Sequence, residues 1–349
     1  MANCAQHMEY ADELALGSMD KRLWLPTTVK EIEALGWDRP DVILFSGDAY
    51  IDHPSFGAAV IGRTLQAAGY RVAILPQPNW QDDLRDFRKL GIPRLFFGIS
   101  AGAMDSMVNH YTAARRRRAD DAYTPGGRHG ARPDYPTIVY SEILKKLFPD
   151  VPVVVGGIEA SLRRLSYDYW QDRLRPSILL DCQADILVYG MGERTITTIA
   201  QAIDAGMPVC NLTNIRQTVI RVRSTDIPAA DEHNIILNSW EQCLHDRRCQ
   251  SLNFKHIEQQ SNRRNGGATL WQQYGNNGVK ANPMYPAMDI GEIDASFDLP
   301  YTRMPHPRYR GKRIPAYEMI RHSVNMHRGC FGGCAFCTIS AHQGKFIAS

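Results

Sequence analysis

The chain has 349 residues, 44% of them hydrophobic and 22% charged, and a formal net charge of +3. This is the composition of a soluble globular protein long enough for two domains. The sequence has no run of about 18 apolar residues, so it predicts no membrane span. The first 20 residues lack the basic and then apolar order of a secretion signal, so we expect a cytoplasmic protein. The small net charge does not by itself indicate a nucleic-acid partner.

The eight cysteines are too sparse for a disulfide scaffold, and three of them lie within eight residues near the carboxyl end. Such a distribution is typical of a reducing compartment. The other five show no ligand spacing, and we interpret them as ordinary thiols: Cys4, Cys182, Cys210, Cys243 and Cys249.

After an amino-terminal extension (1–40), short continuous apolar runs alternate with helical patterns up to about residue 210. Continuous apolar strands separated by amphipathic helices predict a doubly wound parallel α/β sheet covered on both faces. We expect strands over 42–45, 72–75, 95–99, 151–155 and 186–189, and helices over 55–68, 140–148 and 195–205.

Small residues follow four of these strands. In a parallel sheet, ligands bind outside the carboxyl ends of the strands, where loops meet helix amino termini. These loops therefore either turn the chain or line a ligand site. They are Ser46-Gly47-Asp48, Ser100-Ala101-Gly102, Gly156-Gly157 and Gly190-Met191-Gly192-Glu193.

Residues 115–132 carry four consecutive arginines, then glycines and a proline-flanked end, which predicts a long surface loop. The loop is either simply solvated or offers its guanidinium groups to an anionic partner such as a phosphate or nucleic-acid backbone. Arg163 and Arg164 are candidates to lie beside these arginines, and we call the combined surface the basic rim.

Beyond residue 210 the pattern changes, and we expect a helical connector and proline-rich linker over 211–315. An exposed strand is predicted at 218–223, one long helix at 234–263 and an irregular segment at 282–307. Residues 316–326 are expected to form a strand leading into the cysteine loop, and 316–349 the start of a further domain.

The three clustered cysteines, Cys330, Cys334 and Cys337, have C-x-x-x-C-x-x-C spacing among glycines. Thiolates select iron–sulfur clusters, zinc or copper, and a cubane cluster held by only three of them leaves one iron open to a small-molecule ligand. Phe336 would shield such a cluster from water. Zinc with one of His322, His327 or His342 is an alternative. So are three buried free thiols.

Three segments together resemble the YgiQ family of radical S-adenosylmethionine proteins. They are Ser100-Ala-Gly-Ala-Met-Asp-Ser-Met, Gly156-Gly-Ile-Glu-Ala-Ser-Leu-Arg-Arg and Cys330-Phe-Gly-Gly-Cys334-Ala-Phe-Cys337 with its continuation Thr-Ile-Ser-Ala-His-Gln-Gly-Lys. The resemblance implies a [4Fe–4S] cluster on the three cysteines, S-adenosylmethionine on the open iron and the start of a partial (β/α) barrel. It also implies a reductant such as flavodoxin or ferredoxin.

The resemblance does not identify a substrate. Because few residues follow the motif, we expect an incomplete chain that is inactive alone as a radical enzyme. The alternative function is a non-catalytic module that binds a ligand or partner and holds a metal on its cysteines.

The α/β region also resembles the cobalamin-binding domain of many radical S-adenosylmethionine enzymes. Histidine-ligated cobalamin proteins carry D-x-H-x-x-G, whereas this chain has Asp52-His53-Pro54-Ser55-Phe56-Gly57. We therefore expect no cobalamin on His53, and a helix-capping role for Asp52 or Ser55. A His53→Ala change is then expected to leave the fold intact.

Overall fold

The structure is a computed structural model that describes residues 20–167, 170–263 and 266–330, together with 332, 334, 337, 339, 342, 344, 347 and 348. Its strands form one nine-stranded sheet in the order β2-β1-β3-β4-β5-β6-β9-β8-β7. The strands are β1 (Val42–Ser46), β2 (Val72–Pro76), β3 (Phe96–Ser100), β4 (Val153–Gly156), β5 (Ile186–Val188), β6 (Thr218–Arg223), β7 (Asn234–Ile236), β8 (Thr269–Tyr274) and β9 (Asn277–Ala281).

Strands β1 to β5 are all parallel, and each lies within two residues of a predicted strand. β1 and β2 are buried along their whole length, as expected for strands covered on both faces. The order 2-1-3-4-5 belongs to the doubly wound class, in which the strand order reverses between β1 and β3. The parallel α/β prediction is thus confirmed for this half of the sheet.

Alternate strand residues enter two separate hydrophobic cores. Ile43 and Phe45 of β1 pack with Tyr140 on one face, and Val42 and Leu44 contribute to the core on the other. The helices are α2 (Val29–Ala34), α3 (Gly57–Ala67), α4 (Arg85–Arg88), α5 (Ser106–His110), α6 (Pro136–Leu147), α7 (Gly157–Leu162), α8 (Ile178–Asp181), α9 (Glu193–Asp204), α10 (Trp240–His245), α11 (Arg247–Ser261), α12 (Ile290–Phe297) and α13 (Pro315–Ile320). Helices α3 and α9 contribute to one core, whereas α6 and α7 contribute to the other.

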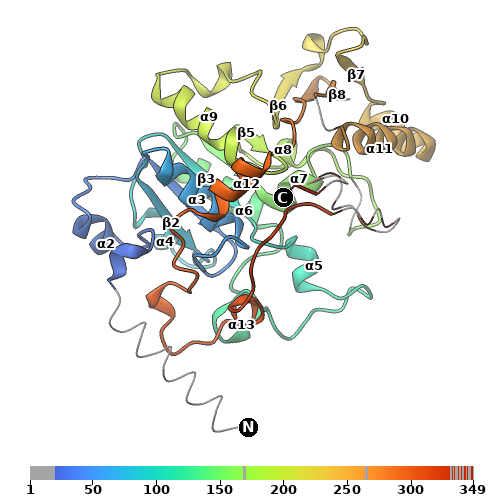
Figure 1. Cartoon of the computed structure of the whole chain (residues 1–349). Coiled ribbons are helices and arrows are strands. Elements are labelled where there is room, and N and C mark those ends of the chain that lie inside the picture. The colour runs from blue at the N-terminus through green and yellow to red at the C-terminus, as the bar shows by residue number, and fades with distance from the viewer. Residues whose placement is uncertain are drawn as a thin grey trace.

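The sheet continues beyond residue 210, where we had expected a helical connector. β6 joins the edge of β5 antiparallel, and β9, β8 and β7 follow it. The single helix predicted over 234–263 was wrong: the segment forms β7, α10 and α11. Ser239 and Asp246 start the two helices by accepting hydrogen bonds from backbone amides. Figure 1 shows this pair at the opposite end of the molecule from α2.

Residues 282–330 run back along the molecule to the parallel strands. The expected irregular segment contains α12, which Asp289 and Glu292 begin with a capping box. The strand expected over 316–326 was also wrong. Pro315 occupies the first turn of α13, where its fixed φ suits a helix and its missing N–H costs nothing. Residues 316–326 therefore do not form the first strand of a barrel.

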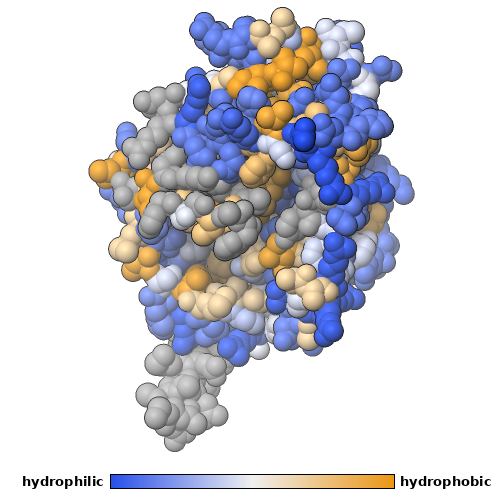
Figure 2. All heavy atoms as spheres, turned by 90° about the vertical axis from the view of Figure 1, so that its right-hand side faces the viewer, coloured by the Kyte–Doolittle hydropathy of each residue, from blue (hydrophilic) through white to orange (hydrophobic). Residues whose placement is uncertain are grey.

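No helix among the described residues is long and apolar enough to cross a membrane. Exposed large hydrophobic side chains are spread over several elements, for example Leu244 on α10, Leu252 on α11 and Met319 on α13. On the face in Figure 2, hydrophobic residues accordingly form separate patches within a mostly hydrophilic surface.

Candidate functional site

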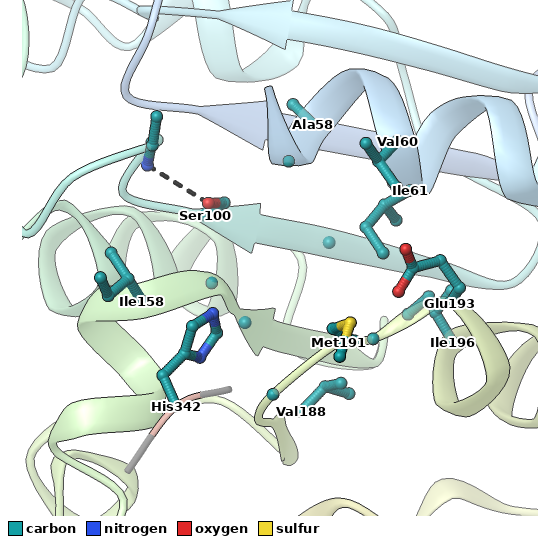
Figure 3. Close-up of a pocket in the computed structure, with 18 of the residues that line it drawn as sticks. Ala58, Val60, Ile61, Ser100, Ile158, Val188, Met191, Glu193, Ile196 and His342 are labelled. Carbon is teal, nitrogen blue, oxygen red and sulfur yellow. Dashed lines mark hydrogen bonds between the residues drawn. The ribbon is translucent and has the colours of Figure 1, made fainter. Parts of the chain in front are cut away.

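A cavity of about 510 Å³ opens at the carboxyl edge of the parallel strands. It is lined by residues at or directly after the ends of β3, β4 and β5, including Ser100, Gly156 and Gly190. Opposite them, the first turns of α3 and α9 contribute Ala58 and Glu193, and Figure 3 shows these side chains around one space. Three of the four predicted loops thus meet at one site, and its volume is within the range of small-molecule pockets.

The chain just before the cysteine motif closes one side of this cavity. Residues 327–329 line it, and so does His342 beyond the motif. The guanidinium of Arg328 forms an ion pair with Glu193 and donates to Ser296 Oγ of α12 over 2.9 Å. Burial lowers the pKa of Arg328 to about 10, which leaves it charged at neutral pH. These contacts fasten the approach to the cysteine loop onto the α/β sheet.

Cys330, Cys334 and Cys337 are all exposed, so the interpretation as buried core thiols was wrong. A Cβ added to Gly332 would lie 3.4 Å from Cys334 Sγ and 3.5 Å from Cys330 Sγ. The two sulfurs therefore flank this glycine. The amide of Gly332 also points to Cys330 Sγ, 3.5 Å away. Exposed soft donors around a glycine turn fit a thiolate-bound cluster.

Within the part of the chain that the structure describes, no three metal-binding side chains converge on one point. Neither a Cys₃ nor a Cys₃His set is thus preassembled there. Phe336, predicted to shield the cluster, lies outside the described residues. Of the histidines considered for zinc, His322 and His327 are exposed and His342 is buried.

Two of the predicted loop glycines are required for the close packing of neighbouring loops, although Gly102 also lines the cavity. A Cβ on Gly47 would lie 2.1 Å from the carbonyl oxygen of Ala101, and one on Gly102 would lie 2.2 Å from Asp48 Oδ1. Gly102 also has φ +119°, which disfavours any side chain. The loops after β1 and β3 are therefore held together at distances that only glycine permits.

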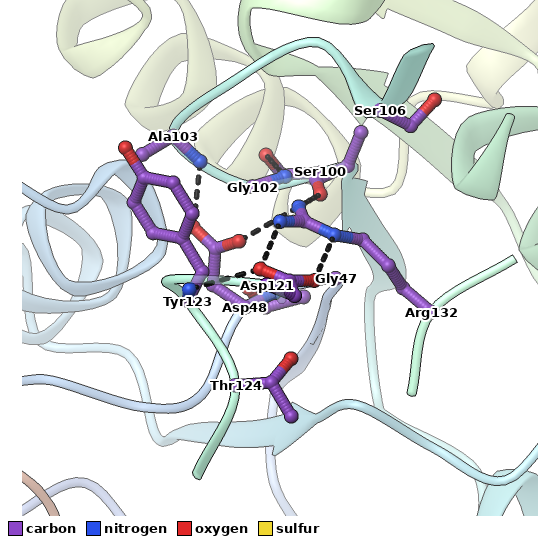
Figure 4. A network of polar contacts seen from close by, with 12 residues as sticks. Gly47, Asp48, Ser100, Gly102, Ala103, Ser106, Asp121, Tyr123, Thr124 and Arg132 are labelled. Atoms are coloured by element: carbon purple, nitrogen blue, oxygen red, sulfur yellow. Dashed lines mark hydrogen bonds and ion pairs between the residues drawn. The ribbon is translucent and has the colours of Figure 1, made fainter. Parts of the chain in front are cut away.

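A buried ion network fastens the same two loops (Figure 4). Arg132 Nη1 donates to Asp48 Oδ1 and to the carbonyl of Ala101, each over 2.8 Å, and Arg132 Nη2 lies 3.2 Å from Asp121 Oδ1. All three charged side chains are less than 5% exposed. Burial raises the pKa of Asp48 to about 6 despite the opposing charge of Arg132.

The predicted basic rim is thus only partly a surface feature. Arg115 to Arg118 are exposed, as expected for a loop, but the end of the same segment turns inward with Arg132. Arg163 and Arg164 are also buried, so placing them on the rim was wrong. Because their charges are not offered to solvent, they are not available to an external anion.

Buried side chains from two of the sequence segments that carry the family resemblance contact each other. Arg163 Nη2 lies 2.7 Å from Asp105 Oδ2, and Arg163 Nη1 lies 3.4 Å from Glu159 Oε2. Glu159 is fully buried and accepts hydrogen bonds from both the amide and the hydroxyl of Ser106. These polar residues therefore join α5 to α7 rather than line the cavity.

The segment Asp52-His53-Pro54-Ser55 also has a structural explanation. Asp52 does not cap α3; its carboxylate pairs with buried Arg63 at 2.5 Å and accepts the amide of Thr302 at 2.8 Å. Ser55 does not cap the helix either, and its hydroxyl donates to Asn325 over 3.2 Å. His53 is buried, and its Nδ1 accepts the amide of Ser55.

These contacts revise the expectation for His53. Burial and the charge of Arg303 lower the pKa of its imidazole from 6.5 to about 4, so the folded protein holds it neutral. Since the unfolded chain protonates this group near pH 6.5, its contribution to stability is present above that pH and is lost as pH falls toward 4.

We expect His53→Asn, which can still accept the Ser55 amide, to be less stable than the original chain at pH 7.5. The difference in the free energy of unfolding between the two proteins should narrow by about 2 kcal/mol at pH 5, because only the original chain loses the histidine contribution. Urea unfolding at the two pH values measures both differences. A difference that widens at pH 5 would contradict a neutral buried His53.

The sequence patterns did not indicate two features of the site. One is the apolar wall of Ile61 and Ile196, whose side chains reach the cavity from the amino-terminal halves of α3 and α9. The other is the pair of Glu193 with Arg328, which are more than 130 positions apart in the sequence. Glu193 was predicted to lie in the loop after β5, but its distant partner was not visible in the sequence.

The fold and the site together define a mixed α/β protein that has a ligand-sized cavity beside a cysteine loop. The chain belongs to the family described as Radical SAM N-terminal, which matches residues 24–323. The matched region ends seven residues before Cys330. The resemblance to the YgiQ family of radical S-adenosylmethionine proteins is confirmed.

Among curated proteins, a UPF0313 protein of Porphyromonas gingivalis is 66% identical over 327 residues, covering 93% of this chain and 51% of the relative. A UPF0313 protein of Bacteroides thetaiotaomicron is 62% identical over 339 residues, with 93% and 54% covered. One of Geobacter sulfurreducens is 48% identical over 327 residues, with 93% and 53% covered. The chain spans about half the length of these relatives.

Two solved structures of TsrM from Kitasatospora setae, described as a radical S-adenosylmethionine methyltransferase, also match. One holds tryptophan and an S-adenosylmethionine analogue; it is 18% identical with a TM-score of 0.34, covering 51% of this chain and 28% of TsrM. The other holds cobalamin and a [4Fe–4S] cluster, with 19% identity, a TM-score of 0.33 and coverage of 51% and 26%. This similarity is too low to assign the activity or the bound groups of TsrM to this chain.

Proposed function

We propose that this chain is the cluster-binding part of a radical S-adenosylmethionine protein. Cys330, Cys334 and Cys337 would ligate a [4Fe–4S] cluster, with Phe336 beside the third ligand. The observation that carries the proposal is the position of the cysteines: all three are exposed, Cys330 and Cys334 flank Gly332, and Cys330 directly follows Gly329, which lines the cavity. Three thiolates leave one iron for the amino and carboxylate groups of S-adenosylmethionine.

When bound, such a cluster supplies one electron that breaks a carbon–sulfur bond of S-adenosylmethionine, giving methionine and a 5′-deoxyadenosyl radical. A small protein such as flavodoxin or ferredoxin would provide that electron. The protein itself contributes position and shielding. In this chain the pair of Arg328 with Glu193 holds the residues just before Cys330 at the cavity, where the cofactor would then bind.

Anaerobic reconstitution with iron and sulfide, followed by reduction with dithionite, tests this proposal. We expect the electron paramagnetic resonance spectrum of the reduced cluster to change when S-adenosylmethionine is added, because the cofactor chelates one iron. Methionine added alone at the same concentration is the control. A spectrum unaffected by S-adenosylmethionine would contradict an open iron.

The second candidate is a module that binds a ligand but performs no chemistry, which the ligand-sized cavity favours. The same reduced sample distinguishes the two functions. Formation of 5′-deoxyadenosine above the level of a Cys334→Ala sample would exclude the module. A cluster that binds S-adenosylmethionine without forming 5′-deoxyadenosine would support the module for this chain.

A further inference from the structure

The cavity has an apolar wall, and its floor is open at the glycine that ends β4. Ile61 and Ile196 form part of the wall (Figure 3), and Gly156, the last residue of β4, forms part of the floor. Gly192 lies against the wall itself, because a Cβ added to it would be 3.4 Å from Ile61 Cδ1. A Cβ added to Gly156 would touch only Val188, at 3.4 Å or more, so the floor is open at this point. The open space over Gly156, beside branched aliphatic side chains, suits a flat apolar body such as an aromatic ring.

The amino termini of two long helices bring positive charge to the same space. Helices α3 and α9 have 11 and 12 residues, and their first residues, Gly57 and Glu193, line the cavity. Neither helix has a capping side chain at its N-cap residue, Phe56 or Gly192. Amide groups and helix dipoles at these ends favour an anion.

A second observation points to a ligand independently of the helices. His342 lines the cavity near Ile158 and is only 8% exposed (Figure 3). Among the described residues, its Nδ1 has no hydrogen-bond partner. Burial, together with the charge of Arg164, lowers the pKa of His342 to about 4, so it is neutral at pH 7. A buried imidazole nitrogen without a partner is costly unless a bound molecule satisfies it.

The fixed charges at the site leave room for one added negative charge. Glu193 brings a carboxylate into the cavity, but Arg328 neutralises it. With this pair cancelled, the unbalanced electrostatic contribution comes from the helix amino termini and is positive. A neutral ligand would gain no attraction from the helix amino termini, and a cationic ligand would be repelled by them.

We propose that the cavity binds a flat, largely apolar molecule that carries one anionic group. Its ring would lie over Gly156, with the anion near the first turns of α3 and α9. Gly329 lines the cavity and adjoins Cys330, so this molecule would lie beside the cluster loop as the substrate. The assignment as substrate rests on the proposed function, whereas binding itself does not.

Binding can be tested with 2-naphthoate as the probe and its neutral isostere 2-naphthamide as the control, using the full chain without a cluster. We expect calorimetry or ligand-observed NMR to show one naphthoate site and at least fivefold weaker binding of naphthamide. Equal binding of the two compounds would overturn the anion preference.

Two substitutions in α3 test where the probe binds. Ala58→Phe fills the cavity from the first turn of α3 and should weaken naphthoate binding at least tenfold, while Ala67→Phe, exposed at the other end of the same helix, should not. Unchanged binding to a folded Ala58→Phe protein would show that the probe binds elsewhere.

A second variant does not depend on filling the cavity. Glu193→Gln removes the carboxylate that balances Arg328, so naphthoate should bind at least threefold more tightly and naphthamide equally well. Weaker naphthoate binding would contradict the charge argument. If naphthoate binds as expected but reconstituted protein shows no cluster, the cavity assignment stands and the radical function fails.

Discussion

Changing Cys334 to alanine should abolish iron binding by this protein. After anaerobic reconstitution, we expect the original chain to hold about four irons and four sulfides. Cys334→Ala should hold less than about one iron, because two thiolates cannot retain a cubane cluster in competition with chelators. Iron and sulfide analysis after gel filtration, together with the visible absorption of the cluster, measures the difference.

Cys210→Ala provides a matched control. Cys210 is another exposed free cysteine, far from the motif in sequence, so its removal should leave the iron content unchanged. Cys330→Ala and Cys337→Ala should behave like Cys334→Ala. Stoichiometric zinc without iron absorption in the original chain would contradict the cluster assignment, and so would equal iron content in all the variants.

Replacing Arg132 with methionine should cost about 3–5 kcal/mol of the free energy of unfolding. Methionine keeps the apolar part of the side chain but leaves the carboxylates of Asp48 and Asp121 buried without their partner. Such uncompensated charges are far more expensive than the loss of a surface ion pair. Urea unfolding at pH 7.5 followed by circular dichroism measures the loss.

Arg116→Met tests the exposed part of the same segment and should change the free energy of unfolding by about 0.5 kcal/mol at most. Adding Asp48→Asn and Asp121→Asn to Arg132→Met should recover part of the lost stability, since no charge then stays unpaired. Equal stability of Arg132→Met and Arg116→Met would show that the buried network does not hold the loops together.

The parallel half of the sheet was predictable because burial on both faces demands continuous apolar strands, which residues such as Ile43 and Leu44 display locally. The carboxyl-edge site followed from the general geometry of parallel sheets. The cysteine cluster was also visible in the sequence, since its spacing is a local property. What each glycine does at the edge was less evident, because a turn, a close contact and an open floor all select the same residue.

Elements beyond residue 210 were harder to predict. Polar, mixed-charge residues over 234–263 suited one helix by periodicity, but capping by Ser239 and Asp246 divides it, and the neighbouring β8 recruits β7 into the sheet. Local propensity is a weak prior that pairing with a distant strand readily overrides.

The sequence by itself determined the alternating α/β pattern, the glycine-rich strand ends and the clustering of three cysteines, because each depends on residues close together in the chain. Only the tertiary structure decided which arginines are buried, since Arg132 and Arg163 find their carboxylate partners through the fold. It also decided that the segment before Cys330 closes the cavity, through the pairing of Arg328 with Glu193. Burying a charge is favourable only where a partner of opposite charge meets it, and that meeting is a property of the folded chain.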